Sequence, residues 1–179
     1  MWTGFYTVKV NICGIKAACQ YQRGQYQLRF ARDQQYVHLQ LTYFRYPTGI
    51  NTWTGVAFGK SMSDGLDFIG VRVLGDRILV SDEFVRGFRP PVLDVGQNII
   101  VESASLFNGD LRVRLARPIF SNDTADFSLA NCLPWQFPTL SPLDPNGRIL
   151  KHRITPQGMV VCMNRCPCGP ASAQNQCQL

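Results

Sequence analysis

The sequence predicts an all-β protein built as an antiparallel sandwich, and three observations lead to this prediction. Apolar and polar residues alternate with a period of two along most of the chain, no long stretch has the spacing of an amphipathic helix, and turn motifs separate the alternating segments. The length of 179 residues suits one domain with a tail, since domains usually hold about 100–200 residues. The hydrophobic fraction of 45% excludes disorder as a description of the whole chain.

The first half of the chain is predicted to hold a hairpin followed by three strands. In the segment 36–43, Leu39 and Leu41 point to one side and His38 to the other, which indicates a half-buried strand with a solvated histidine. Its hairpin partner is the segment 25–30, and Arg32-Asp33-Gln34 forms the turn. The further predicted strands cover residues 53–58, 68–74 and 77–81, the last two joined by Gly75-Asp76.

The second half contains the strongest hairpin signal, Asn108-Gly109, because both residues accept a positive φ. It joins predicted strands at 98–107 and 110–115. Four prolines lie between Cys132 and Pro145, so we predict an extended crossing or irregular loop there rather than a central strand. The segment 158–163 is predicted to close the sheet.

Lysine and arginine number 18 against 12 aspartates and glutamates, a formal net charge of +6. The cations are scattered rather than gathered into a basic run, so we expect no nucleic-acid partner and at most a general attraction for anionic surfaces. Motifs for a nucleophile elbow, a phosphate-binding loop, a zinc-protease helix and a dinucleotide-binding turn are all missing from the sequence. We therefore expect an electron-transfer or ligand-binding domain rather than an enzyme.

Four of the seven cysteines fall in the last 18 residues, in a stretch too poor in apolar residues to form its own core. Cysteines in this setting indicate a disulfide-tied tail in an oxidising compartment. The odd count leaves a thiol that is free or paired between chains, which makes a disulfide-linked dimer possible. The alternative is a zinc site at Cys162, Cys166 and Cys168, but no second pair of ligands follows at the spacing of a zinc finger.

Asn122-Asp123-Thr124 is an N-glycosylation sequon in a polar segment. Together with the cysteines, it favours a secreted protein or the extracellular face of a membrane. The chain does not begin with a signal peptide, so we expect a mature or truncated form. No apolar run approaches the ~18 residues of a membrane span, so we expect any membrane anchor to lie outside these residues.

Two side chains stand out as candidate ligands. Met62 lies among turn residues rather than in a core pattern, and His152 follows the proline-rich crossing. Each has an ordinary explanation, a methionine filling an apolar gap and a structural histidine. As a pair they could bind a haem iron from its two sides, and Met/His ligation raises the reduction potential and suits electron transfer.

Five segments between about Cys19 and Met163 form a recognisable series. In order, they are TWTGVAFGKSMSDGLDFIGVRV, LVSDEF, RPPVLDVGQN, LRVRLARPIFSNDTADFSL and NGRILKHR. In their order and spacing, this part of the sequence resembles the DOMON domain. The resemblance implies an immunoglobulin-like antiparallel β-sandwich at residues 19–163, preceded by an N-terminal extension (1–18) and followed by a Cys-rich tail (164–179).

Haem-binding members of this family hold b-type haem between a methionine and a later histidine. Met62, followed by Asp64 and Asp67, matches the first motif, and His152, after Gly147, matches the second. The resemblance therefore implies one haem b with Met62 and His152 as the axial ligands of its iron, and single-electron exchange with a redox partner protein or a small-molecule donor or acceptor. The absence of C-x-x-C-H makes the haem non-covalent.

Other residues receive supporting roles. Arg148 or Arg153 is a candidate partner for a haem propionate, because arginine binds carboxylates bidentately. The candidate walls of the haem pocket, each of which could equally be core, are Trp53, Phe58, Phe68 and Trp135. The aspartates expected to cap turns are Asp64, Asp67, Asp82 and Asp94.

Two alternatives remain open. In the first, a haem-free DOMON module binds a sugar or a protein at the cell surface through exposed aromatics such as Tyr43, Phe44 and Tyr46. In the second, the Cys-rich tail is the functional part, as a covalent dimerisation or docking arm.

Overall fold

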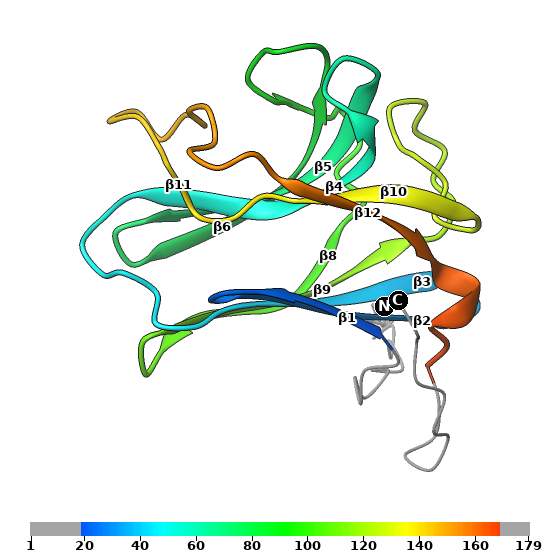
Figure 1. Cartoon of the computed structure of the whole chain (residues 1–179), viewed down its shortest axis with the longest axis horizontal. Helices are drawn as coiled ribbons and strands as arrows, with labels where there is room; N and C mark the ends of the chain where they lie inside the picture. The colour runs from blue at the N-terminus through cyan, green and yellow to red at the C-terminus, as the bar shows by residue number, and fades with distance from the viewer. Residues whose placement is uncertain (1–18, 169–179) are drawn as a thin grey trace, which may run out of the picture.

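Two antiparallel sheets stack face to face in the structure, a computed structural model that describes residues 19–168 (Figure 1). The lower sheet in Figure 1 has five strands in the order β1-β2-β3-β9-β8. These strands are β1 (Cys19–Arg23), β2 (Tyr26–Arg32), β3 (Tyr36–Tyr43), β8 (Ile100–Phe107) and β9 (Asp110–Pro118). The predicted sandwich of antiparallel sheets is confirmed.

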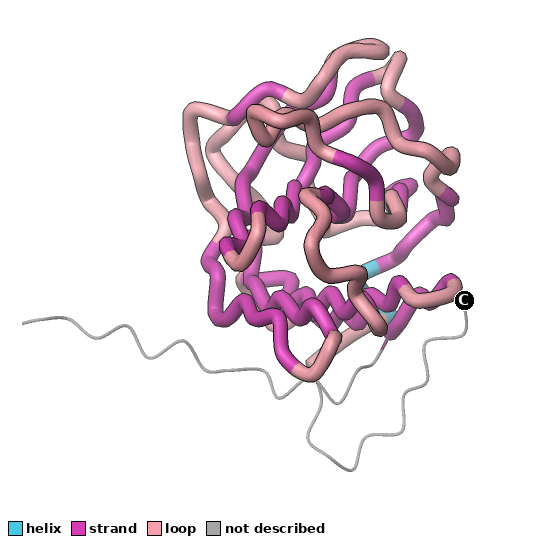
Figure 2. Tube along the Cα trace, turned by 90° about the vertical axis from the view of Figure 1, so that its left-hand side faces the viewer, coloured by secondary structure: helices cyan, strands magenta, loops and turns pink. Residues whose placement is uncertain are grey.

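The second sheet has seven strands in the order β12-β10-β4-β5-β6-β7, with β11 paired to β4. These strands are β4 (Thr52–Ser61), β5 (Gly65–Leu74), β6 (Arg77–Val85), β7 (Val92–Leu93), β10 (Cys132–Phe137), β11 (Ser141–Pro142) and β12 (Gln157–Cys162). Strands and loops make up nearly the whole described trace (Figure 2). The described helix is a single 3-10 turn, η1 (Met163–Arg165). Within residues 19–168, no helix has the length and apolar character needed to cross a bilayer.

The predicted hairpin turns lie where the turn residues place them. Asn108 and Gly109 have φ of 51° and 77° and connect β8 to β9. Gly75-Asp76 connects β5 to β6, and Asp33 accepts hydrogen bonds from the backbone N–H groups of Gln35 and Tyr36 in the β2–β3 turn. Side-chain and backbone preferences of single turn residues therefore set the strand boundaries at these positions.

The prediction for the proline-rich crossing was wrong at its start. Cys132–Phe137 forms β10, which lies between β12 and β4. The strand tolerates Pro134 because β4 pairs with it only at Trp135 and Gln136, so Pro134 has a paired strand on one side only. The segment from 157 to 162 does close the sheet, as β12 at its edge.

One hydrophobic core fills the space between the two sheets. It takes apolar side chains from the inner faces of both, such as Leu39 and Val113 from the five-stranded sheet and Val56 and Ile69 from the seven-stranded sheet. These residues recur at every second position of their strands, as the pleat of a strand requires. The sandwich core thus accounts for the apolar residues at alternate positions of these strands, Val37, Leu39 and Leu41 in β3 and Leu111, Val113 and Leu115 in β9.

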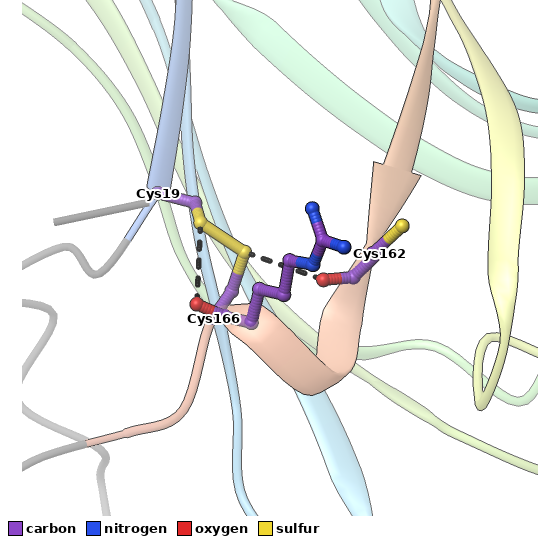
Figure 3. Close-up of a disulfide and its surroundings, with 4 residues drawn as sticks. Cys19, Cys162 and Cys166 are labelled. Carbon is purple, nitrogen blue, oxygen red and sulfur yellow. Dashed lines mark hydrogen bonds between the residues drawn. A yellow bond between two sulfur atoms is a disulfide. The ribbon is translucent and has the colours of Figure 1, made fainter. Parts of the chain in front are cut away.

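Two disulfides tie the described chain together. Cys19 in β1 is bonded to Cys166 directly after η1, across 147 residues (Figure 3). Cys132 and Cys162 face each other across β10 and β12 and form the second bond. The zinc alternative for Cys162 and Cys166 is therefore wrong, because both sulfurs are already bonded. The tail beyond residue 168, with the proposed dimerisation arm, lies outside the described residues.

Replacing both Cys132 and Cys162 with serine is expected to lower the free energy of unfolding by about 2–4 kcal/mol. The disulfide restricts the conformations of the unfolded chain, and without it folding loses more conformational entropy. Urea unfolding followed by tryptophan fluorescence measures this loss. An unchanged midpoint in the double variant would show that the β10–β12 pairing holds without the bond.

Candidate functional site

A second apolar cluster lies on the face of the seven-stranded sheet that points away from the sandwich core. Its side chains come from the alternate positions of β4, β5 and β6 and from the segment around β11, and none comes from the five-stranded sheet. The members of this outer cluster are Trp53, Ala57, Leu66, Phe68, Val85, Leu143 and Ile149, with Met62 and Leu74 packed against it half-buried. The first eight residues of β4 are therefore buried on both faces.

Two glycines leave room for neighbouring side chains to pack closely on the outer face of the seven-stranded sheet. A Cβ on Gly55 would lie 2.1 Å from the carbonyl oxygen of Ile69 and 2.8 Å from the ring of Phe68. A Cβ on Gly70 would lie 2.6 Å from Oε1 of Glu83. The ring of Phe68 meets Trp53 edge-on, with centroids 5.9 Å apart. Glycine at these two positions is thus a condition for the packing of the outer cluster.

Met62 lies in the turn between β4 and β5. Its carbonyl oxygen accepts hydrogen bonds from the N–H of Gly65 within the turn, at 3.4 Å, and from the N–H of Gly87 just after β6, at 2.8 Å. These bonds fix the backbone, and the half-buried side chain packs against the outer cluster. The hydroxyl of Ser61 donates a hydrogen bond to the carboxylate of Asp64 across the same turn, a bond between two side chains rather than the bond to the backbone expected of a turn cap.

His152 lies in the segment that follows β11, shown in orange at the upper left of Figure 1. Nε1 of Trp53 donates to the carbonyl oxygen of Leu150 at 3.0 Å, and the N–H of Arg153 donates to Oγ of Ser141 at 3.3 Å. Because Ser141 pairs with Trp53 in the sheet, both bonds fasten the segment to the start of β4. The histidine is half-buried between these two anchor points.

The predicted pocket walls divide between the two clusters. Trp53 and Phe68 belong to the outer cluster, whereas Phe58 and Trp135 lie in the sandwich core, where their rings meet at 4.9 Å. Alternation along β4 separates Trp53 from Phe58. The two residues are five positions apart, an odd number, so their side chains point to opposite faces of the sheet.

Charged groups also lie on the outer face. Arg72 on β5 and Glu83 on β6 form a bidentate ion pair with distances of 2.5 and 2.8 Å, and Ser81 donates to the same carboxylate. Arg148 and Arg153, the predicted propionate partners, are exposed. Arginine side chains are thus available at the edge of the apolar surface, while Arg72 already has a partner.

Three of the four predicted turn-capping aspartates have a different setting. Asp67 and Asp82 are fully buried and face the sandwich core. Asp67 accepts a hydrogen bond from the N–H of Phe127 at 2.7 Å, so it bonds the distant β9–β10 loop rather than its own turn. Asp94 has a buried Oδ2 that accepts no hydrogen bond. Their positions in the polar, turn-rich parts of the sequence suggested capping, but the pleat of β5 and β6 points the first two inward.

Two further sequence expectations were wrong. His38 is 1% exposed rather than solvated, with Nε2 at 2.9 Å from Asp33 and Nδ1 at 3.5 Å from Glu102. Tyr46, expected as an exposed aromatic, is buried, and its hydroxyl bonds Thr52. The polar partners of these residues come from other strands and turns, so local alternation does not reveal them.

Two antiparallel sheets, an inter-sheet core and a second apolar cluster on the outer face define this chain as a disulfide-bonded β-sandwich domain. The DOMON domain pattern matches residues 20–138, more than half of the chain, and the chain therefore belongs to the DOMON family. The solved structure of the cytochrome domain of cellobiose dehydrogenase from Myriococcum thermophilum has a similar fold, with a TM-score of 0.59 and 14% sequence identity over 82% of this chain and 81% of that one. A comparison with curated proteins finds no match.

Proposed function

We propose that this chain is a DOMON haem protein that binds one b-type haem, with Met62 and His152 as the axial ligands of the iron, and passes single electrons. One observation carries the proposal: a buried apolar cluster lies outside the sandwich core, and both candidate ligands belong to segments bound to it. Met62 packs against the cluster, and Trp53 of the cluster holds the carbonyl group next to the His152 segment.

The residues present fit the chemistry of this group. A porphyrin needs apolar side chains as neighbours, and the outer cluster provides buried apolar side chains next to Met62. A thioether and an imidazole together fill both axial positions of a haem iron, and such a haem supplies one-electron transfer at a raised potential. Arg148 and Arg153 are exposed near the His152 segment and are suited to binding propionate carboxylates.

The disulfides and the glycosylation sequon indicate where the protein is located. Disulfides are typical of oxidising compartments, and we propose a secreted protein or one on the extracellular face of a membrane. Asn122 of the sequon is exposed in the loop between β9 and β10, where a glycan has room. The electron partner is a redox protein or a small molecule, and the domain carries out no turnover of its own.

The test is the visible absorption spectrum of the full chain, produced in an oxidising, haem-replete host, before and after dithionite. We expect a sharp Soret band and resolved α and β bands on reduction, the pattern of six-coordinate low-spin haem. A featureless spectrum that stays so after haemin is added would contradict the proposal and leave the outer cluster as ordinary packing.

A second candidate is a haem-free module that binds a sugar or a protein. It is favoured by one observation, a run of exposed apolar side chains between β6 and β8. These are Phe88, Val92, Leu93 and Val95, with Phe88 at 86% and Val95 at 104% relative exposure. A colourless protein that refuses haemin but binds a glycan or a partner in a pull-down with purified candidates would favour this module.

A further inference from the structure

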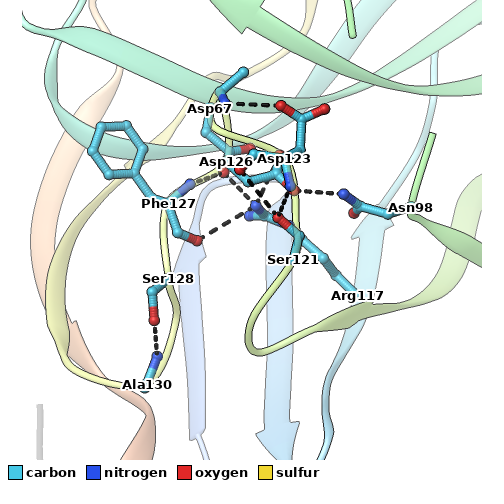
Figure 4. A network of polar contacts seen from close by, with 10 residues as sticks. Asp67, Asn98, Arg117, Ser121, Asp123, Asp126, Phe127, Ser128 and Ala130 are labelled. Carbon is cyan, nitrogen blue, oxygen red and sulfur yellow. Dashed lines mark hydrogen bonds and ion pairs between the residues drawn. The ribbon is translucent and has the colours of Figure 1, made fainter. Parts of the chain in front are cut away.

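A group of buried carboxylates lies between the two sheets, and Figure 4 shows two of them, Asp67 and Asp126, beside Arg117. Asp67 on β5 and Asp82 on β6 point inward from diagonal positions, because Asp67 pairs with Phe84 and Asp82 with Ile69. Asp126 reaches the same place from the loop between β9 and β10. One oxygen from each of these three aspartates, here called the acid cluster, lies within 4.8 Å of the other two.

The negative charge of this region exceeds the positive charge. Arg117 at the end of β9 donates to Asp67, and its Nη2 lies 3.2 Å from Oδ1 of Asp126. Asp94 also acts electrostatically on Asp82. Four carboxylates therefore share one described guanidinium. The neighbouring Arg72 is paired to Glu83 on the opposite face of the sheet and does not compensate them.

Several oxygens in this region are buried and accept no hydrogen bond. Both carboxylate oxygens of Asp82, a residue with 0% exposure, are of this kind. Asn98 donates through its amide nitrogen to Asp126 at 2.5 Å, which leaves its own carbonyl oxygen unused. The oxygens concerned are Asp67 Oδ1, Asp82 Oδ1 and Oδ2, Asp94 Oδ2 and Asn98 Oδ1. Oδ1 of Asp126 accepts no hydrogen bond either, but it is ion-paired with Nη2 of Arg117 at 3.2 Å. Buried acceptors without a donor are rare because each costs free energy.

Burial also disfavours the charged state of these aspartates. Desolvation raises the pKa of Asp67 to about 7, against the opposing effect of Arg117. Desolvation likewise raises the pKa of Asp82 to about 7, with Asp126 and Asp94 adding to the rise. A bound cation would stabilise the ionised forms of both groups.

We propose that the acid cluster binds one calcium ion, with carboxylate oxygens of Asp67, Asp82 and Asp126 as ligands. Two oxygens that each lie about 2.4 Å from one Ca²⁺ are at most about 4.8 Å apart, which the three aspartates satisfy. The unpartnered acceptors at the acid cluster are all oxygens, while Nε and Nη1 of Arg117 are buried donors without an acceptor. Oxygen ligands select a hard cation such as Ca²⁺ over zinc or copper. The positive charge offsets the excess of carboxylates that Arg117 leaves unpaired.

The binding of Ca²⁺ is measured on the full-length wild-type chain after treatment with EGTA and desalting. Isothermal titration with CaCl₂ is expected to give one site per chain. At a hundredfold excess of Ca²⁺ over the dissociation constant, the melting temperature is expected to rise by about 5–10 °C relative to EGTA. Mg²⁺ is expected to give a smaller rise, because it keeps its waters and demands a regular octahedron.

The matched variants lie on one hairpin. Asp82→Asn keeps the shape of the side chain and is expected to weaken Ca²⁺ binding at least tenfold, whereas Asp76→Asn, an exposed aspartate in the β5–β6 turn, is expected to bind like the wild type. If Asp82→Asn does not fold, Asp126→Asn is measured in its place. The CaCl₂ titration of the wild type tests Ca²⁺ binding in either case.

Absence of both a binding heat and a thermal shift in the wild type would overturn the proposal, and so would wild-type affinity in Asp82→Asn. The site lies on the inner face of the sheet and Met62 and His152 belong to the outer face, so calcium binding does not rest on haem. Ca²⁺ binding by a colourless protein would support this site while contradicting the proposed function.

Discussion

Replacement of His152 with alanine is expected to abolish the six-coordinate low-spin haem spectrum that we propose for the wild-type chain. The imidazole is one of two axial ligands, and its removal leaves the iron with Met62 alone, which shifts it to a five-coordinate or solvent-bound form. Met62→Leu is expected to have the same effect on the spectrum, because it removes the other proposed axial ligand. Leucine keeps the apolar volume against the outer cluster, so the loss would report the sulfur rather than the packing.

Absorption and electron paramagnetic resonance spectra of the purified variants measure this effect. Met159→Leu is the matched control, because Met159 is a half-buried methionine on β12 that packs against the sandwich core. It is expected to keep the wild-type spectrum. If Met62→Leu and His152→Ala both kept that spectrum as well, the two residues would not be the ligands.

Replacement of Arg117 with methionine is expected to lower the free energy of unfolding by about 3–5 kcal/mol, since removal of one partner from a buried ion pair leaves charge without compensation. Arg117 is 1% exposed and donates to Asp67 and to the carbonyl oxygen of Phe127. Its guanidinium also lies 4.8 Å from the ring centroid of Phe58. The variant would lose the hydrogen bonds and the cation–π contact together.

Chemical unfolding in the presence of EGTA measures this loss without compensation by a divalent ion. Arg112→Met is the control on the same strand, because Arg112 is largely exposed and pairs with Asp110 at the surface. Surface pairs contribute about 0–1 kcal/mol. Equal stability of the two variants would mean that Arg117 is not needed to balance the buried carboxylates.

The parts of the fold that follow from short-range chemistry are predictable from sequence. Asn108-Gly109 and Gly75-Asp76 define their turns because few other residues accept these backbone conformations. The strong backbone preference of proline also led to the wrong prediction that Pro134 does not lie in a strand. Proline excludes a strand paired on both sides, but β10 pairs with β4 only beyond that position, a detail of register that the sequence does not carry.

Burial is less predictable, because alternation shows which residues share a face and not what covers that face. His38 alternates with polar residues, yet Asp33 and Glu102 close over it. Asp82 looked like a turn residue, and only the pairing of β5 with β6 and the approach of the β9–β10 loop place it in a buried group.

For the candidate haem site, the sequence singled out Met62 by its unusual setting, and the structure places that side chain against an apolar cluster. The outer cluster itself was not predicted as a unit, because Ile149 and Leu143 come from the irregular segment around β11. Long-range packing of such segments depends on bonds like that between Trp53 and Leu150.

The bond between Cys19 and Cys166 has a mechanical consequence. It joins the first residue of β1 to the residue just after η1, across 147 positions of sequence. A pulling force applied between the segments that flank the sandwich would pass through this covalent bond instead of through the hydrogen-bonded strands. The enclosed sheets would keep their pairing under tension for as long as the bond remained oxidised, so the domain would act as a link of nearly fixed length between whatever is attached at its two ends.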